Sequence, residues 1–197
     1  MAVPPPSPDL TDKQALRATL RRGRAAFVAG LGDARPAAEA ALAGRLLERI
    51  PPGATVALYQ ALPDEPDPAP LAGLLAAEGH RLALPHVAAD KVTMRFLAWQ
   101  PGDPLAKGGF GILQPIGTDA VAPAVIVTPL VGFDRAGGRI GQGAGHYDRA
   151  FAALPGAIRV GYAWSVQEQA SVPHDPWDVP LHAVATEAEW IGVEAIS

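Results

Sequence analysis

The sequence predicts an α/β protein whose largely parallel, twisted sheet is covered by helices on both faces. Short apolar runs typical of strands alternate along the chain with segments of helical periodicity. Several of those runs are apolar throughout, as expected for strands that are buried on both faces of a parallel sheet. With 197 residues, of which 49% are hydrophobic, the chain can bury a substantial core within one domain.

The N-terminal part predicts a flexible segment followed by a helix. Residues 1–10 are rich in proline and read as a flexible lead-in, so we expect a single domain over residues 11–197. Thr11 offers an N-cap oxygen, and Gln14 three residues later completes a capping box. Apolar residues then recur at helical spacing, at Leu16, Leu20 and Phe27.

The next elements follow from periodicity and from helix-breaking residues. A second helix is expected over residues 36–50, and the prolines and glycine of residues 51–53 end it. Residues 55–59 form an apolar run that predicts a buried strand. Residues 71–78 have helical character, and Gly79 marks the end of that helix.

The second half of the chain continues the alternation. A strand is expected at residues 81–84, and residues 92–99 alternate in part, which indicates a strand with one wetter face. The clearest buried strand covers residues 124–129. A glycine-rich loop follows, then a helix at residues 147–154 and two further strands at residues 158–162 and 184–186. Such a succession predicts a Rossmann-like architecture of three layers.

Composition excludes several classes of protein. The chain has no cysteine, which excludes disulfides and thiolate zinc sites. A net charge of −4 argues against nucleic acid as the main partner. The N-terminus lacks the features of a signal peptide, and nowhere do about 18 apolar residues run together, so no membrane association is expected. We therefore expect a cytoplasmic protein, and we expect it to be a monomer.

The stretch 131–149 carries the strongest functional signal. It follows the strand at 124–129 and precedes a helix, and ligands of parallel sheets bind where strands end. Arg139 offers a planar cation suited to phosphate oxygens, and Asp148 offers a hard oxygen ligand suited to magnesium. Glycines alternate in the loop, where they let the backbone approach a ligand, at Gly141, Gly143 and Gly145.

The glycine-rich stretch has a simpler interpretation and lacks two common motifs. It could be a surface turn in which Arg139 and Asp148 only pair with each other. No Lys-Ser or Lys-Thr completes a P-loop, and His146 stands where a dinucleotide fingerprint needs its last glycine.

Basic residues form a stripe on the first helix. The stripe consists of Lys13, Arg17, Arg21 and Arg24. Their spacing of four, four and three residues places them on one face of the helix. This face could bind phosphate groups, or it could be an ordinary solvated surface.

The stretch 131–149 resembles the signature of 5-formyltetrahydrofolate cyclo-ligases. In that family the signature contains Phe-Asp, a Gly-x-Arg-Leu-Gly turn, alternating glycines and Tyr-Tyr-Asp-Arg. Four shorter segments match the family in the expected order, at residues 13–17, 62–65, 110–115 and 173–187. The resemblance spans residues 12–189. Two departures are His146, which replaces the first tyrosine of the signature, and Gln114, which replaces a glutamate. Residues 128–130 also differ modestly from the family's strand end.

The resemblance implies a set of site residues. For ATP it implies Lys13, Arg17, Arg139, Gly141, Gln142, Gly143, Ala144, Gly145, His146 and Tyr147. For the folate substrate it implies Gln60, Glu65, Gln142, Gly143, Gly145 and His146. For magnesium it implies Asp148 and Asp178, although Asp178 could simply be a turn residue. The catalytic groups would be Arg139 and Asp148.

The resemblance also implies an activity. The protein would convert 5-formyltetrahydrofolate to 5,10-methenyltetrahydrofolate with ATP and magnesium, by phosphorylation of the formyl oxygen and ring closure, releasing ADP and phosphate. A non-catalytic or regulatory folate- or nucleotide-binding protein and a small-molecule kinase are the alternatives. A metal hydrolase is a more distant one, and it would be built on His174, Asp175, Asp178 and His182.

Overall fold

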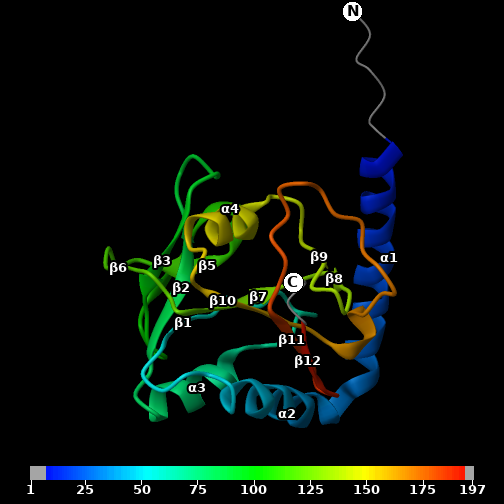
Figure 1. Cartoon of the computed structure of the whole chain (residues 1–197). Helices are drawn as coiled ribbons and strands as arrows, with labels where there is room; N and C mark the ends of the chain where they lie inside the picture. Colours follow the sequence, from blue (N-terminus) through cyan, green and yellow to red (C-terminus); the bar gives the residue numbers. More distant parts are fainter. Residues whose placement is uncertain (1–7, 194–197) are drawn as a thin grey trace, which may run out of the picture.

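The computed structural model describes residues 8–193 and has the expected mixture of helices and strands (Figure 1). The α-helices are α1 (Pro8–Leu31), α2 (Arg35–Leu47), α3 (Ala69–Ala77) and α4 (His146–Ala153), and the 3-10 turns are η1 (Gly32–Ala34), η2 (Gly109–Gly111) and η3 (Ser165–Gln167). The strands are β1 (Thr55–Ala57), β2 (Arg81–Val87), β3 (Met94–Ala98), β4 (Leu105–Lys107), β5 (Leu113–Pro115), β6 (Ala120–Val121), β7 (Val125–Pro129), β8 (Gly132–Phe133), β9 (Arg139–Ile140), β10 (Ile158–Tyr162), β11 (Ala183–Ala185) and β12 (Trp190–Gly192).

Eight strands form one central sheet in the order β12-β11-β10-β7-β1-β2-β3-β6. The five inner strands, from β11 to β2, are parallel to one another. Strands β12, β3 and β6 pair in antiparallel fashion at the two edges. The predicted largely parallel sheet is therefore confirmed.

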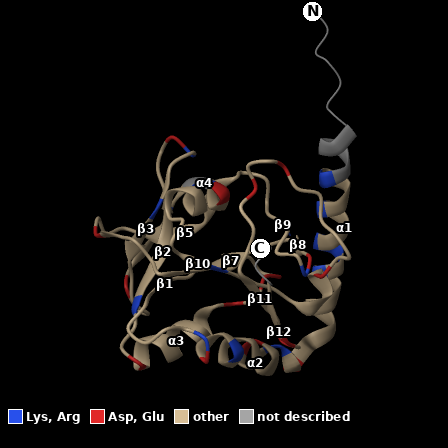
Figure 2. Cartoon of the chain, in the orientation of Figure 1, with Lys and Arg blue, Asp and Glu red and all other residues tan. Residues whose placement is uncertain are grey.

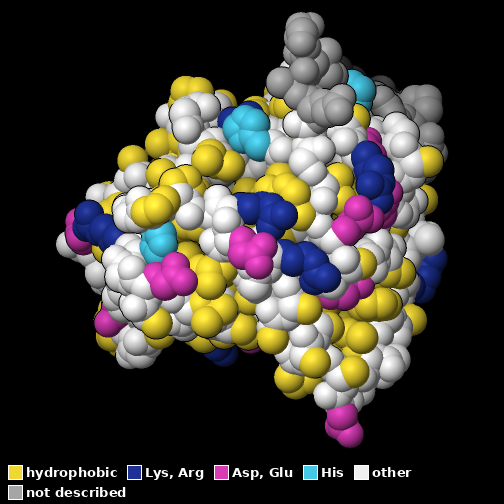
Figure 3. Space-filling model, turned by 60° about the horizontal axis from the view of Figure 1, so that its bottom comes forward, with side chains coloured by type: hydrophobic (Ala, Val, Ile, Leu, Met, Phe, Trp, Pro, Cys, Tyr) yellow, Lys and Arg dark blue, Asp and Glu magenta, His cyan; other side chains and the backbone are white. Residues whose placement is uncertain are grey.

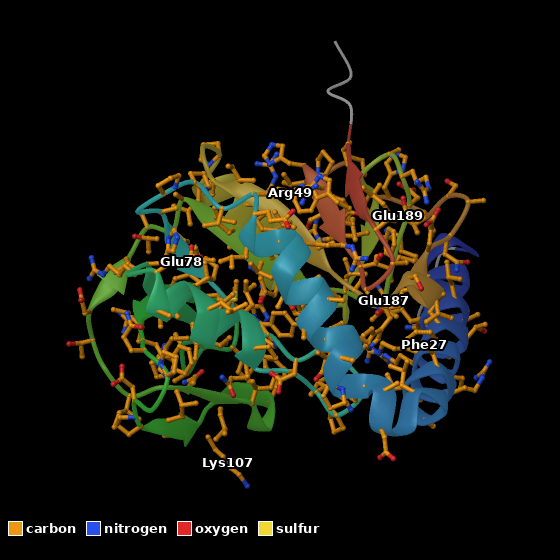
Figure 4. All side chains as sticks on the ribbon, turned by 90° about the horizontal axis from the view of Figure 1, so that it is seen from below. Phe27, Arg49, Glu78, Lys107, Glu187 and Glu189 are labelled. Carbon is orange, nitrogen blue, oxygen red and sulfur yellow. The ribbon has the colours of Figure 1, made fainter. Side chains whose placement is uncertain are left out.

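Helices cover both faces of this sheet, so the predicted three-layer architecture is also confirmed. Helices α2 and α3 lie side by side under one face (Figures 1 and 4). Their leucines, among them Leu42 and Leu75, pack with strand residues such as Val127. On the opposite face, Phe151 of α4 packs with a second buried cluster that includes Ile126.

Helix α1 lies along the flank of the molecule. Leu20 packs with Val131 and Ile140, and the Phe27 ring lies 5.7 Å from that of Trp164. The helix begins at Pro8, before the expected N-cap at Thr11, so that prediction is wrong. A proline is tolerated in the first helical turn, where its missing N–H has no partner anyway. The flexible segment expected at residues 1–10 falls mostly on residues 1–7, which lie outside the described residues.

The predicted elements are all present, with some shifts at their ends. The strand at residues 158–162 has the expected bounds, whereas β2 extends to Val87 and α2 ends at Leu47. The pattern did not predict β12, the hairpin of β4 and β5, the edge strand β6 or the short hairpin of β8 and β9. These strands are only two or three residues long, which is too short for an apolar alternation to register.

The strand order locates the position for a ligand site. Counted along the chain, the parallel strands lie in the spatial order 2-1-3-4-5, which reverses between β1 and β7. In open α/β sheets, ligands bind in the crevice outside the carboxyl ends of the strands at such a reversal.

The surface of the domain carries mixed charges. On the side that bears α2 and α3, basic and acidic side chains are interspersed among apolar ones (Figure 3). Within the described residues, no helix has both the length and the hydropathy that crossing a bilayer requires.

Candidate active site

A cavity of about 520 Å³ opens at the carboxyl ends of β1 and β7, a size typical of small-molecule sites. Every residue that the sequence analysis assigned to ATP, folate or magnesium lines this cavity. The fold thus brings together segments from α1, from the residues after β1, from the glycine-rich loop and from the chain near Asp178. The individual roles of these residues stay predictions.

The basic face of α1 forms one wall of the cavity. Lys13 is buried, and its Nζ lies 2.7 Å from Asp175 Oδ2 and 3.5 Å from Asp178 Oδ2. Arg17 donates from Nε to the carbonyl of Gly141 at 3.0 Å. In Figure 2, α1 carries blue segments and the loop beside it carries red ones. The alternative of a solvated basic face is therefore wrong for Lys13.

Arg139 and Asp148 form an ion pair within the cavity wall. The Arg139 guanidinium donates to Asp148 Oδ1 and to the carbonyl of Val179, and it lies 4.7 Å from the centroid of the Phe151 ring. Asp148 Oδ1 also accepts from the Val179 N–H at 3.2 Å. The pairing of Arg139 with Asp148 that the simpler interpretation supposed does form, but the Arg139 side chain is only 5% exposed, so the pair lies in the cavity wall and not on an open surface turn.

The glycine-rich loop needs glycine at two points. Gly143 has a φ of +105°, and Gly145 has a φ of +66° at the N-cap of α4. Side chains are disfavoured at such angles, and a Cβ at Gly145 would lie 3.1 Å from the Arg149 guanidinium. The loop therefore brings its backbone close to the cavity without a side chain in between.

Glu65 lies at another corner of the cavity and is 3% exposed. Its Oε2 accepts from the Leu62 N–H at 3.0 Å, and its Oε1 accepts from Gln142 Nε2 at 3.2 Å. Burial raises the pKa of the Glu65 carboxyl above its usual 4.5, although the Leu62 N–H and the nearby Arg24 guanidinium act in the opposite direction.

Arg24 is a residue of this corner that the sequence analysis did not assign to the site. It is 2% exposed and binds the Asp64 carboxylate through Nε at 3.0 Å and NH2 at 2.9 Å. Its NH1 lies 3.4 Å from Glu65 Oε1 and donates to the Leu130 carbonyl at 3.2 Å. The basic stripe was the available signal, but spacing alone does not distinguish a buried arginine from an exposed one.

The remaining wall is largely apolar and includes Phe110 and Met94. The Phe110 ring lies 5.6 Å from the His146 ring, whose Nε2 is 2.9 Å from the carbonyl of Lys91. Gln114, the second departure from the family pattern, accepts from the Val87 N–H at 3.1 Å and donates to the Val87 carbonyl at 3.5 Å. A carboxylate could only accept, so the glutamine adds a donor to this contact.

Thr128 is a second residue that the sequence analysis did not assign. It stands near the end of β7, lines the cavity and is 1% exposed. Its hydroxyl has no hydrogen-bond partner among the described residues. The sequence marks it only as part of the strand end at residues 128–130, which differs from the family, and its place in an apolar strand gives no sign of a free hydroxyl.

The two carboxylates predicted for magnesium fit that ion. Hydrogen bonds within the described part of the chain occupy only Oδ1 of Asp148 and Oδ2 of Asp178, so each has a second oxygen for a ligand. Among residues 8–193 no group of three or more His, Cys, Asp or Glu is arranged to hold a metal. Two carboxylates suit magnesium, which keeps waters and shares phosphate oxygens.

The metal hydrolase alternative is not supported, because within residues 8–193 its four residues do not form a group arranged to hold a metal. The ring nitrogens of His182 lie 3.0 Å from the Arg159 backbone nitrogen and 2.9 Å from Arg159 NH2. Asp175 and Asp178 pair with Lys13 of α1.

Residues 9–187 match the family described as the 5-formyltetrahydrofolate cyclo-ligase family. A protein of Escherichia coli named 5-formyltetrahydrofolate cyclo-ligase is 34% identical over 151 residues, which cover 69% of this chain and 81% of that protein. A protein of the same name from Haemophilus influenzae is 38% identical over 93 residues, 44% of this chain and only 50% of that protein. The structure of Aquifex aeolicus 5,10-methenyltetrahydrofolate synthetase superimposes with a TM-score of 0.76 at 27% identity, covering 94% of each chain.

Proposed function

The chain belongs to the 5-formyltetrahydrofolate cyclo-ligase family, and we propose that it converts 5-formyltetrahydrofolate to 5,10-methenyltetrahydrofolate with ATP and magnesium, releasing ADP and phosphate. One observation carries the proposal: a single cavity joins a wall of cations and carboxylates to a largely apolar wall with a buried carboxyl group. The first wall suits a nucleoside triphosphate, and the second suits a flat heterocycle that bears N–H donors.

We assign the residues of this cavity to the two substrates. The ATP phosphates would contact Lys13, Arg17 and the loop over residues 139–147, and the folate would contact Gln60, Glu65 and the loop over residues 142–146. The resemblance places Gln142 in both sets, and its side chain hydrogen-bonds to Glu65 and also to Arg21 on α1. This position supports a role in aligning the two substrates.

The reaction needs alignment and charge stabilisation more than a nucleophilic side chain. The formyl oxygen would attack the γ-phosphorus, and the bond to the bridging β–γ oxygen would break, releasing ADP. The N10 amine would then attack the activated formyl carbon and close the ring, its proton would pass to the departing phosphate or to water, and inorganic phosphate would leave. Arg139 and Lys13 would stabilise the charge on the transferred group. A magnesium ion held by Asp148 and Asp178 would neutralise phosphate charge when bound.

The activity can be tested directly by absorbance of the methenyl product. Purified protein is mixed with 5-formyltetrahydrofolate, magnesium and ATP, and the control omits ATP. We expect absorbance to rise only with ATP. A flat trace from protein that binds both ligands would favour the non-catalytic alternative, whereas ADP release with a phosphorylated folate and no ring closure would favour the kinase.

Glu65 should make folate binding sensitive to acid. We propose that its ionised carboxylate accepts hydrogen bonds from the pterin, and this form prevails only above its raised pKa. Affinity should therefore be full above this raised pKa and should fall as the pH drops through it, at a pH higher than 4.5. The measurement is the folate dissociation constant against pH, for the wild type and for Glu65→Gln. The variant should bind more weakly than the wild type at a pH above the raised pKa and lose the acid-dependent decline, and an identical decline in both proteins would contradict the role of Glu65.

A further inference from the structure

Trp177 differs in its surroundings from the other tryptophans of the chain. It is 70% exposed, the highest value among the large hydrophobic side chains of the described residues, and it lines the cavity. Trp164 is fully buried and donates from Nε1 to the Asp64 carbonyl at 3.1 Å. Trp99 and Trp190 pack against the larger core cluster. Burial in the core therefore accounts for these three residues but not for Trp177.

A short turn holds Trp177 beside the cationic wall. The Asp178 N–H donates to the Asp175 carbonyl at 3.0 Å, and the Asp175 N–H donates to Asp178 Oδ2 at 2.8 Å. The two carboxylates of the same turn bind Lys13 of α1. The indole is thus carried on a turn that is anchored to a residue proposed to bind phosphate.

The indole has no aromatic or cationic partner within the described part of the chain. The ring–ring and cation–ring contacts there involve other residues, including Trp164 and Trp190. An exposed, unstacked indole at the rim of a cavity is a suitable surface for a flat ring. Its water-exposed face would be buried when such a ring binds.

We infer that Trp177 stacks against the base of the bound nucleotide. The inference rests on the proposed function, in which Lys13 and Arg17 bind the phosphates. Trp177 lies in the turn whose carboxylates pair with Lys13, whereas the folate is proposed to contact Gln60, Glu65 and the loop over residues 142–146. Stacking on an indole tolerates any base because every base has a π-face. Trp177 should therefore contribute affinity for the nucleotide without selecting adenine over guanine.

The test compares two anionic probes that differ in having a base. Binding of ADP with magnesium, and of inorganic tripolyphosphate with magnesium, is measured by calorimetry on the full chain, Trp177→Ala and Trp177→Phe. We expect Trp177→Ala to weaken ADP binding about tenfold and to leave tripolyphosphate binding unchanged. Trp177→Phe keeps an aromatic face, so it should retain ADP affinity within about threefold. ADP should quench tryptophan fluorescence in the wild type, and much less in Trp177→Phe.

Three results would overturn the inference. If Trp177→Ala weakened both probes equally, the residue would act through the turn and Lys13. If it raised only the KM for the folate, the indole would belong to the folate. If it left ADP affinity unchanged while the wild type bound ADP, there would be no stacking contact. A wild type that bound neither probe would instead contradict the proposed function itself, so the two failures can be distinguished. Thermal melting of each variant verifies that it is folded.

Discussion

Asp148→Asn is expected to lower kcat on the order of a hundredfold while changing the folate dissociation constant little. Asparagine keeps the size of the side chain and an oxygen that can accept from Arg139 and the Val179 N–H. It removes the negative charge on which magnesium binding would depend. The rate should therefore fall much further than folate binding. Steady-state kinetics and a direct folate-binding measurement on the same protein separate these quantities.

A matched control is available on the surface. Asp119 pairs with Arg81 at 2.7 Å, its side chain is 68% exposed, and it does not line the cavity. Asp119→Asn removes one negative charge, as Asp148→Asn does, but away from the cavity. Its kcat should therefore be unchanged. If Asp148→Asn also left the rate intact, the assignment of Asp148 to the metal would be wrong. If folate binding fell as much as the rate, Asp148 would act by shaping the cavity.

Arg24→Met is expected to destabilise the fold by about 3–5 kcal/mol, because it leaves a buried carboxylate without its cation. Leaving Glu65 unpaired costs more than leaving Asp64 unpaired, because the Glu65 side chain is 4% exposed and that of Asp64 is 27% exposed. Methionine retains much of the length and packing of the arginine stem, so the loss is mainly electrostatic. Denaturant unfolding measures the change in free energy, and folate affinity should fall as well because Glu65 loses a neighbour that orients it.

Arg81→Met serves as the comparison for Arg24. Arg81 also forms an ion pair, but its side chain is 53% exposed, and exposed pairs contribute at most about 1 kcal/mol. The difference between the two variants isolates the effect of burial. A loss below about 1 kcal/mol for Arg24→Met would mean that water or a rearranged side chain compensates Glu65.

Much of the fold could be predicted because its signals are local. The apolar run at residues 124–129 and the glycine that ends α3 depend on neighbours in the chain, so periodicity and breaker residues reveal them. The edge strand β12 could not be found in this way. It consists of Trp190–Gly192 and exists because its backbone pairs with β11, a contact that the local pattern does not encode.

In the candidate site, too, the features that depend on local sequence could be predicted and those that depend on tertiary contacts could not. The glycine-rich loop could be found because its function depends on a continuous run of residues, where Gly143 and Gly145 adopt positive φ angles. Trp177 and Thr128 could not be assigned, since the exposure of one and the missing hydrogen-bond partner of the other depend on what surrounds them. Local pattern carries no information on such surroundings.

The sequence by itself determined the alternation of helices and strands, the position of the glycine-rich loop and the shared face of the basic residues on α1. Only the tertiary structure decided which of these basic residues reach the cavity and which are buried beside it. Lys13 meets Asp175 across 162 positions of the chain, and Arg24 meets Asp64 across 40. The physical reason is that burial and charge pairing arise between segments that only the folded sheet brings together.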